Sequence, residues 1–544
     1  MRRGPYKSMT AFWRSIASMV GAMSGFHWIA ILLKRISIGA LLVAMAIPTA
    51  PPATAQTDQP ISASEALEAG LARRDRAFAS YGIAPPIHPP LHDTSGMTSA
   101  AIRQATDLLP KIAISDVRLG LMQMALAVGP EGQAEIYAAL PSANAPALYL
   151  REGRATLADL VILAAEAGHP NALRSEAGTY TASVPIIVLA GAALAVVDRE
   201  TLVFSGEHGG FLLSFGSLSI VGATITADIS QHAIGPDAFR PFVASLGSGG
   251  LSVRDSRFNG LGFGPSPALS GLSVATAGLY GAHTPSVISR SIFTDLGGVS
   301  VVDSDSVMIE GNWVADARQT AIRVEGSQGA SLLHNVVTGT QGSHAVRLSG
   351  PGRMVEVREN ILSGGDYGGL RLDTGVAGVE VSGNLIEDFR GEGVAVVQGA
   401  RCVWLQSNVI LENGGNAVRA EATGDLVVTG NLLLANGGAG LALREGIEGS
   451  STLIVGNVIA DNTAGLYSAT EGHLRLSGND LSQQLPRLLT GDLAQHTPLL
   501  LRAMRAGSMA DLDIRHVTAS LSVTPAAADA SVRAFAACQG GEAG

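Results

Sequence analysis

The sequence predicts an all-β fold, a right-handed parallel β-helix in which a unit of ~24 residues repeats as one coil of a solenoid. An asparagine recurs at intervals of 23, 25, 24, 24, 23, 26 and 22 residues, in segments such as EGNWV, SGNLI and TGNLL. Before each asparagine lies a second short run, such as AIRVE, AVRLS or GLRLD. In these runs apolar residues alternate with others, as in a strand with one buried face. The asparagines are Asn312, Asn335, Asn360, Asn384, Asn408, Asn431, Asn457 and Asn479.

A single unit of this length cannot bury its own apolar face, but stacked units can, because each coil hydrogen-bonds to its neighbours. We expect the asparagines to stack in one turn, where their amides satisfy buried backbone groups, so we assign them to structure rather than to chemistry. Leucine-rich repeats have a similar length, but their L-x-x-L-x-L frame is missing here. Upstream, Ser256 and Ser291 match the frame with serine in place of asparagine. Parallel coils should therefore extend from about Pro185 to Leu481.

Helical segments are expected on both sides of the coils. Ser64–Phe78 and Ser99–Ala127 are helix-like, and LPRLLTGDLAQHTPLLLRAMRAG after Asn479 indicates helical capping segments. The predicted organisation is a signal peptide at residues 1–55, a partly helical N-terminal region at 56–172, the β-helix at 173–485, and a C-terminal cap with a mobile tail at 486–544.

The N-terminal residues predict export. Lys34 and Arg35 precede an apolar run from Ile36 to Ile47, and Ala53-Thr54-Ala55 follows. A basic flank, a short apolar core and an A-x-A ending are typical of a secretory signal cut after Ala55. The apolar core is too short to span a bilayer, so we expect no membrane span in the mature chain. An uncleaved N-terminal anchor is the alternative, and both interpretations place the remaining residues outside the cytoplasm.

Composition excludes several classes of function. The formal charge is −10, and removal of residues 1–55 takes away six basic residues, leaving 30 basic against 46 acidic residues, or −16. Such a balance argues against a nucleic-acid partner. Cys402 and Cys538 form neither a disulfide framework nor a metal cluster, and we expect no bridge between them. Motifs for phosphate loops, serine hydrolases and metal sites are missing, so no metal and no cofactor are expected.

The alternating runs also predict a column of charges on one face. If Ile322 and Val324 point inward, Arg323 and Glu325 point outward. Neighbouring coils are ~4.8 Å apart, so a column of arginine forks suits the carboxylates of an acidic polysaccharide. A cross-strand ion-pair ladder of little energetic value is the alternative. The same frame exposes Arg347 and Ser349, Arg371 and Asp373, Ala395 and Val397, and Arg419 and Glu421, with His344 and Tyr367 in the turns beside them.

From Leu173 to about Leu493 the sequence resembles the periplasmic mannuronan C5-epimerases of alginate-producing bacteria. The resemblance lies in AGTYTASVPIIVLAGAALAVV, in FRPFVASLGSGGLSVRDSRFNGLGF and in the asparagine-centred coils. It implies a periplasmic isomerase that converts mannuronate to guluronate within an acidic polysaccharide. It further implies a monomer that uses no cofactor and has other periplasmic export proteins as partners.

The family carries an Asp-Pro-His-Asp motif on an exposed strand, and this chain departs from it. The best match is Arg323-Val324-Glu325-Gly326, with Glu325 at the histidine position. One coil earlier, Ser300-Val301-Val302-Asp303 also lacks the histidine. The resemblance therefore implies Glu325 as the proton acceptor. It assigns charge neutralisation to Arg323, Arg347 and Arg371, proton return to His344 or Tyr367, and further substrate contacts to Asp373, Arg419 and Glu421.

Two kinds of function stay open. One is an epimerase, or a lyase that shares its first step, since both begin by removing the C5 proton. The other is a non-catalytic scaffold that binds the polymer and guides or protects it during export. A surface adhesin is a third interpretation, which the sequence favours less.

Overall fold

The computed structural model describes residues 62–93, 108–142, 144–228, 238–276, 284–469, 472–484, 486–505, 511–515 and 518–522. The predicted signal peptide and the predicted tail from Pro525 lie outside these residues. The described residues belong to one compact unit, Pro60–Gly544. Among them, no helix is long and apolar enough to cross a bilayer.

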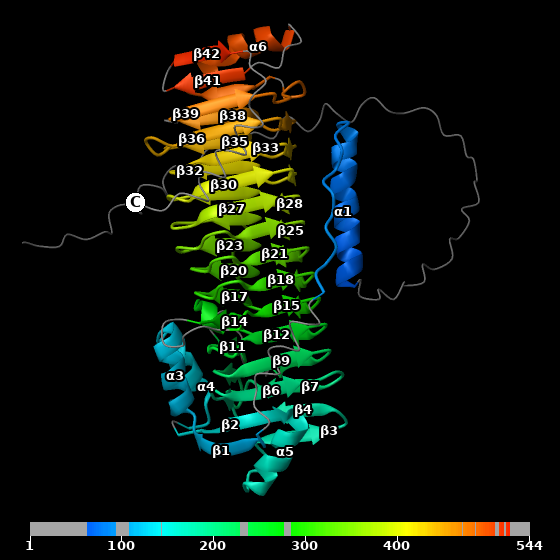
Figure 1. The fold of residues 1–544 in the computed structure, drawn as a ribbon, viewed down its shortest axis with the longest axis vertical. Coiled ribbons are helices and arrows are strands. Elements are labelled where there is room, and N and C mark those ends of the chain that lie inside the picture. Colours follow the sequence, from blue (N-terminus) through cyan, green and yellow to red (C-terminus); the bar gives the residue numbers. More distant parts are fainter. Residues whose placement is uncertain are drawn as a thin grey trace, which may run out of the picture. The chain divides into compact units, whose positions relative to one another are not determined.

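Short parallel strands stack along the long axis into three sheets, A, B and C (Figure 1). Sheet A contains β5 (Ile186–Val188), β8 (Leu212–Ser214), β11 (Val243–Ser245), β14 (Gly271–Ala275), β17 (Gly298–Val302), β20 (Ile322–Glu325), β23 (Val346–Ser349), β26 (Leu370–Leu372), β29 (Val394–Val397), β32 (Val418–Glu421), β35 (Ala439–Arg444), β38 (Ala464–Ala469) and β40 (Leu489–Gly491). Sheet B contains β6 (Ala192–Val196), β9 (Ser217–Val221), β12 (Leu251–Arg254), β15 (Val287–Ser289), β18 (Met308–Glu310), β21 (Ser331–Leu333), β24 (Glu356–Arg358), β27 (Ala377–Ser382), β30 (Arg401–Gln406), β33 (Leu426–Thr429), β36 (Ser451–Val455) and β39 (His473–Ser477). Sheet C contains β4 (Thr179–Ala182), β7 (Thr201–Ser205), β10 (Thr224–Asp228), β13 (Arg257–Asn259), β16 (Ile292–Thr294), β19 (Trp313–Ala315), β22 (Val336–Thr340), β25 (Ile361–Gly365), β28 (Leu385–Phe389), β31 (Val409–Leu411), β34 (Leu432–Leu434) and β37 (Val458–Ala460).

The predicted parallel β-helix is confirmed. Each sheet-A strand pairs in parallel with the strand one coil later, as β20 does with β23. Ile322 and Val324 are buried in the core, as the alternation predicted. The stack begins earlier than expected, because β2 (Pro146–Thr156) pairs in parallel with β5 and then with β6.

The predicted asparagine ladder is present. Asn384 is fully buried, and its Oδ1 accepts hydrogen bonds from the backbone N–H and the side-chain amide of Asn360, both at 2.9 Å. Its Nδ2 donates to Oδ1 of Asn408 and to the Val357 carbonyl. The same pattern runs from Asn312 to Asn479. Earlier coils continue it with serine, since the backbone N–H of Ser256 donates to Oγ of Ser291.

A second ladder was not predicted. It consists of Asn413, Asn436, Asn462 and Gln484, in which each side-chain amide from Asn413 to Asn462 donates to the side-chain carbonyl of the next residue. Its spacing of 23, 26 and 22 residues follows that of the first ladder, in the segments ENGG, ANGG and DNTA. It fixes the turn between sheets C and A.

The outer face of sheet C is apolar and is covered by helix α1 (Ala63–Ser80), which lies alongside the stack (Figure 1). Successive coils place Val336, Ile361, Leu385, Val409, Leu432 and Val458 in one register position. Leu67 and Phe78 of α1 join this cluster. A Cβ at Gly70 would lie 2.6 Å from Ile361, so this glycine allows the close approach of helix and sheet. The signal was present in the sequence, because two apolar residues follow most of the recurrent asparagines.

Polar contacts fix α1 in register with the coils. Arg74 is fully buried and donates to Glu359 and to the Gly383 carbonyl. His88 bonds the same Glu359 at 2.8 Å, and His92 bonds the buried Glu310 at 2.9 Å. A buried charge is tolerated only when it is paired and hydrogen-bonded. These contacts therefore fix the position of the helix and of the segment that follows it.

Both ends of the core are capped. α5 (Leu157–Glu166) covers the first coils, and α6 (Thr497–Arg505) covers the last. The helical prediction for this end is wrong at Leu489–Gly491, where β40 is a strand that pairs in parallel with β38, and it is confirmed at α6. Beyond α6, β41 (Asp511–Arg515) pairs antiparallel with β39 and with β42 (Thr518–Ser522). Another four elements precede or begin the coils: β1 (Lys111–Asp116), α3 (Arg118–Val128), α4 (Gln133–Ala139) and β3 (Leu173–Glu176).

Two further expectations need correction. The helix predicted over Ser99–Ala127 is wrong at Lys111–Asp116, where KIAISD forms strand β1 and pairs antiparallel with β2. Residues 99–107 lie outside the described part of the chain, and α1 confirms the other predicted helix. Cys402 in β30 is disulfide-bonded, against the expectation, and Cys538 lies outside the described residues.

Replacing Asn384 by leucine should lower the free energy of unfolding by several kcal/mol, at ~1–3 kcal/mol for each buried group left without a partner. Two donors of Asn360 would lose their acceptor, and Asn408 would lose a donor. Chemical denaturation measures the change. Asn479→Leu, at the half-buried end of the ladder, is the matched control and should cost less. An equal loss in both variants would contradict cooperation along the ladder.

Candidate functional site

The outer face of sheet A carries the predicted column. The register pairs Arg323 with Arg347, Arg347 with Arg371, Arg371 with Ala395, and Ala395 with Arg419. Each lies between two inward apolar residues, so its side chain points outward. Four of five successive coils therefore present a guanidinium at one position, as the alternation predicted.

Asp373 holds two of these guanidinium groups. Its carboxylate is 5% exposed and accepts from Nε of Arg347 and Nε of Arg371, both at 2.7 Å. Within the described residues, each of the two arginine side chains forms only this one bond. The N–H donors of their Nη groups therefore have no described partner. This arrangement fixes the direction of both arginines while it leaves donors for a ligand carboxylate.

Arg323 differs from its neighbours. It is half-buried, and within the described residues its side chain forms no hydrogen bond and no ion pair. Burial and the adjacent Arg347 lower the pKa of Arg323, while Glu325 acts in the opposite direction. A partly desolvated cation beside another cation is unfavourable, and a bound anion would relieve it.

His344 lies in the turn before β23. Burial first, then Arg371 and Arg347, lower the pKa of His344 to about 4, although Asp373 and Glu392 oppose the shift. A Cβ at Gly368 would lie 3.0 Å from Cδ2 of His344. The ring centroids of His344 and Tyr367 are 6.2 Å apart. The imidazole is thus neutral at neutral pH. The proton-return role that the sequence assigned to His344 or Tyr367 stays a prediction.

The column continues to Arg419 with different partners. Arg419 pairs with Glu392 at 3.2 Å and with Glu421 at 2.7 Å. Ala395 and Val397, which the alternation predicted to be exposed, are only 1% and 3% exposed, so this expectation is wrong for both residues.

The structure therefore brings His344, Arg347, Tyr367, Arg371 and Asp373 into one cluster. Arg323 and Glu325 lie one coil earlier, and Arg419 and Glu421 lie two coils beyond Arg371. Sequence reasoning missed Glu392. It lies three residues before Ala395 of the column, just as His344 lies three residues before Arg347. That shared position in the frame is the signal that would have found it. The described residues include no group of three or more His, Cys, Asp or Glu side chains able to hold a metal.

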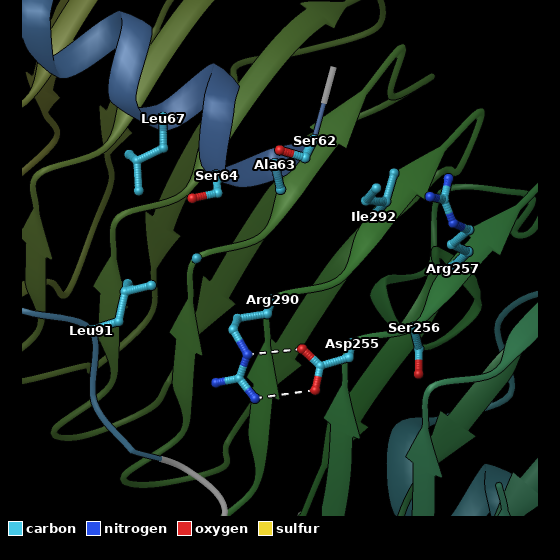
Figure 2. A pocket seen from close by; sticks show the side chains of 11 residues that line it. Ser62, Ala63, Ser64, Leu67, Leu91, Asp255, Ser256, Arg257, Arg290 and Ile292 are labelled. Carbon is cyan, nitrogen blue, oxygen red and sulfur yellow. Dashed lines mark hydrogen bonds and ion pairs between the residues drawn. The ribbon is translucent and has the colours of Figure 1, made fainter. Parts of the chain in front are cut away.

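A pocket of about 300 Å³ lies away from this face (Figure 2). It is formed between the start of α1, Leu91 and the turns between sheets B and C. Its polar wall is an ion pair in which Arg290 binds Asp255 through two bonds, at 2.8 and 3.1 Å. The pocket contains none of the predicted site residues.

Comparison with known proteins supports the fold. Residues 341–481 match the family model described as "Right handed beta helix region". The chain is 25% identical over 320 residues to a mannuronan C5-epimerase of Pseudomonas aeruginosa, covering 54% of this chain and 57% of the relative. It is also 25% identical to mannuronan C5-epimerase AlgG of Azotobacter vinelandii, covering 58% and 61%. The matches thus span about three fifths of the relatives' own length. The crystal structure of the periplasmic alginate epimerase AlgG superposes with a TM-score of 0.61 at 21% identity, over 71% of this chain and 97% of that chain.

The fold and the family model define the chain as a right-handed parallel β-helix protein, as predicted. Within that class, its similarity to the mannuronan C5-epimerases, first indicated by the sequence, is confirmed.

The lowered pKa of His344 predicts a pH dependence of stability. Between pH 6.5 and about 4 the unfolded chain binds a proton at His344 that the folded chain does not. The free energy of unfolding should therefore decrease as the pH is lowered from 6.5 to about 4, and this group should contribute up to ~3 kcal/mol of that decrease. His344→Gln removes the contribution, so the difference between the two unfolding free energies should change by that amount between pH 7 and 4. A constant difference would show that His344 titrates alike in both states.

Proposed function

We propose that the outer face of sheet A binds an acidic polysaccharide built from uronates and epimerises it at C5. The observation that carries this proposal is the Arg323–Arg347 pair. Arg323 has no partner among the described residues, and Arg347 is held by its Nε with its Nη groups free of described partners. One uronate carboxylate could be bound between them.

Epimerisation requires that carboxylate to be neutralised. The C5–H bond breaks, the electron pair moves into an enolate-like system, and a proton returns to C5 from the opposite face of the ring. The substrate is isomerised, so no co-reactant is needed. Arginine donors aimed at the carboxylate stabilise the charge that develops on it.

His344 and Glu325 lie on opposite flanks of the arginine column. His344 precedes Arg347 by three residues, whereas Glu325 follows Arg323 by two. We assign the removal of the C5 proton to neutral His344. A bound carboxylate offsets the charges of Arg347 and Arg371, so binding should raise the pKa of His344 toward the range useful for a base. The proton then returns on the flank of Glu325. The motif comparison suggests the reverse assignment, with Glu325 as acceptor.

A non-catalytic scaffold for polymer export is the second candidate. It is favoured by the absence of the family's histidine motif and by the ion pairs that Asp373, Glu392 and Glu421 form with column arginines. In both cases the proposed location is the periplasm, and other export proteins are the proposed partners.

Arg323→Glu tests the binding face. It removes a cation without orphaning a carboxylate, and the new carboxylate lies beside Arg347. Thermal stability should therefore be kept or raised, while affinity for polymannuronate falls on the order of 30-fold or more. Calorimetric titration at low salt measures it.

Arg401→Glu, at an exposed arginine on sheet B, is the matched control and should bind as the wild type does. Unchanged affinity in Arg323→Glu would reduce the column to an ion-pair ladder.

Epimerisation in heavy water should place deuterium at C5 of polymannuronate, which NMR detects even when conversion is slight. His344→Gln should abolish this exchange while binding persists, because glutamine cannot accept the proton. Glu325→Gln should also slow it, since it removes the group on the opposite flank.

The outcomes separate the candidates. Exchange lost only in Glu325→Gln would make Glu325 the acceptor and His344 a bystander. Binding by the wild type with no exchange at all would establish the scaffold. Appearance of an unsaturated, ultraviolet-absorbing product would identify a lyase.

A further inference from the structure

The register column does not end at Arg419. The next two coils place Ala442 and then Tyr467 at the same position. Six successive pairings therefore connect Arg323 to Tyr467, a distance of ~29 Å at ~4.8 Å per coil. A polymer that follows the column would reach an aromatic side chain at its far end.

Small residues support the Tyr467 ring. Ala439, Ala442 and Ala464 form a buried cluster, and Tyr467 packs against it as a partly buried residue. On the next coil, a Cβ at Gly491 would lie 3.1 Å from Cε2 of the ring, so glycine leaves room for the ring there. The hydroxyl group of Tyr467 forms no hydrogen bond with the described residues.

A cation accompanies the ring. The Arg444 guanidinium carbon lies 5.2 Å from the centroid of the Tyr467 ring, and Arg444 is exposed. An aromatic face attracts the C–H face of a sugar ring by its negative quadrupole, and an adjacent guanidinium binds a carboxylate. Because Arg444 is exposed, its guanidinium can move off the ring to bind a carboxylate, and the ring face that it uncovers can stack on the same uronate residue.

We propose that Tyr467 and Arg444 form a distal subsite that stacks and pairs one uronate residue of the polymer bound along the arginine column. This inference rests on the proposed function. It makes affinity depend on chain length, because a short oligomer at Arg323–Arg371 cannot reach Tyr467, whereas a long one can.

Calorimetric titration with a mannuronate trimer and a mannuronate octamer tests the subsite. Tyr467→Ala should weaken octamer binding about tenfold and leave trimer binding unchanged. Tyr467→Phe keeps the ring and should bind the octamer as the wild type does. Arg444→Ala touches no core residue and should also weaken only the octamer, which keeps the test open if Tyr467→Ala unfolds. Tyr137→Ala, at a partly exposed tyrosine on α4, is the matched control.

Octamer affinity unchanged in both Tyr467→Ala and Arg444→Ala would overturn the subsite while leaving the arginine column in place. Equal losses for trimer and octamer would also overturn it, because they would indicate a change at the column itself. Failure of the wild type to bind either oligomer would overturn the proposed function and the subsite together.

Discussion

The buried amide ladders are the constraint on which the remaining structure depends. In the ladder, a buried asparagine such as Asn384 accepts from the coil before it and donates to the coil after it, so a lost bond leaves a buried polar group without its partner. A shift of one residue in any coil would break these bonds and also turn its inward side chains outward. The ladder therefore fixes register, and register aligns Arg323, Arg347 and Arg371 into one column. The buried amides thus position the guanidinium groups of the proposed site without contacting them.

The sequence predicted this column because inward positions must be apolar, so the residues between them must point outward. It offered ion pairing only as an alternative and did not predict which carboxylate binds which arginine. Asp373 bonds the arginines of two coils, and Glu392 reaches Arg419, which depends on side-chain directions that alternation leaves open. The neutral state of His344 also needed the structure, since it follows from burial and from the charges of Arg371 on the next coil and of Arg347.

Several features of the fold were also not predicted from the sequence. The residues of the second amide ladder and of the apolar outer face of sheet C both recur in the repeat. They were overlooked because only one face of each strand was considered. An apolar column on that outer face requires a cover, and α1 is separated from it by hundreds of residues in sequence. The strand at Lys111–Asp116 was missed because a helical pattern on its C-terminal side was extended through it.

A solenoid that binds a regular polymer faces a difficulty, because equivalent coils offer equivalent positions and no single place for chemistry. This column resolves it by breaking its own repeat. Arg371 and Arg419 each carry a carboxylate partner two residues later, but Arg323 has no bond to Glu325 and is half-buried beside Arg347. The one imidazole of the described face lies in the turn before Arg347. In the proposed function, the unpaired Arg323 and the neutral His344 therefore come together at β20 and β23, and the paired coils beyond them would hold the polymer in line.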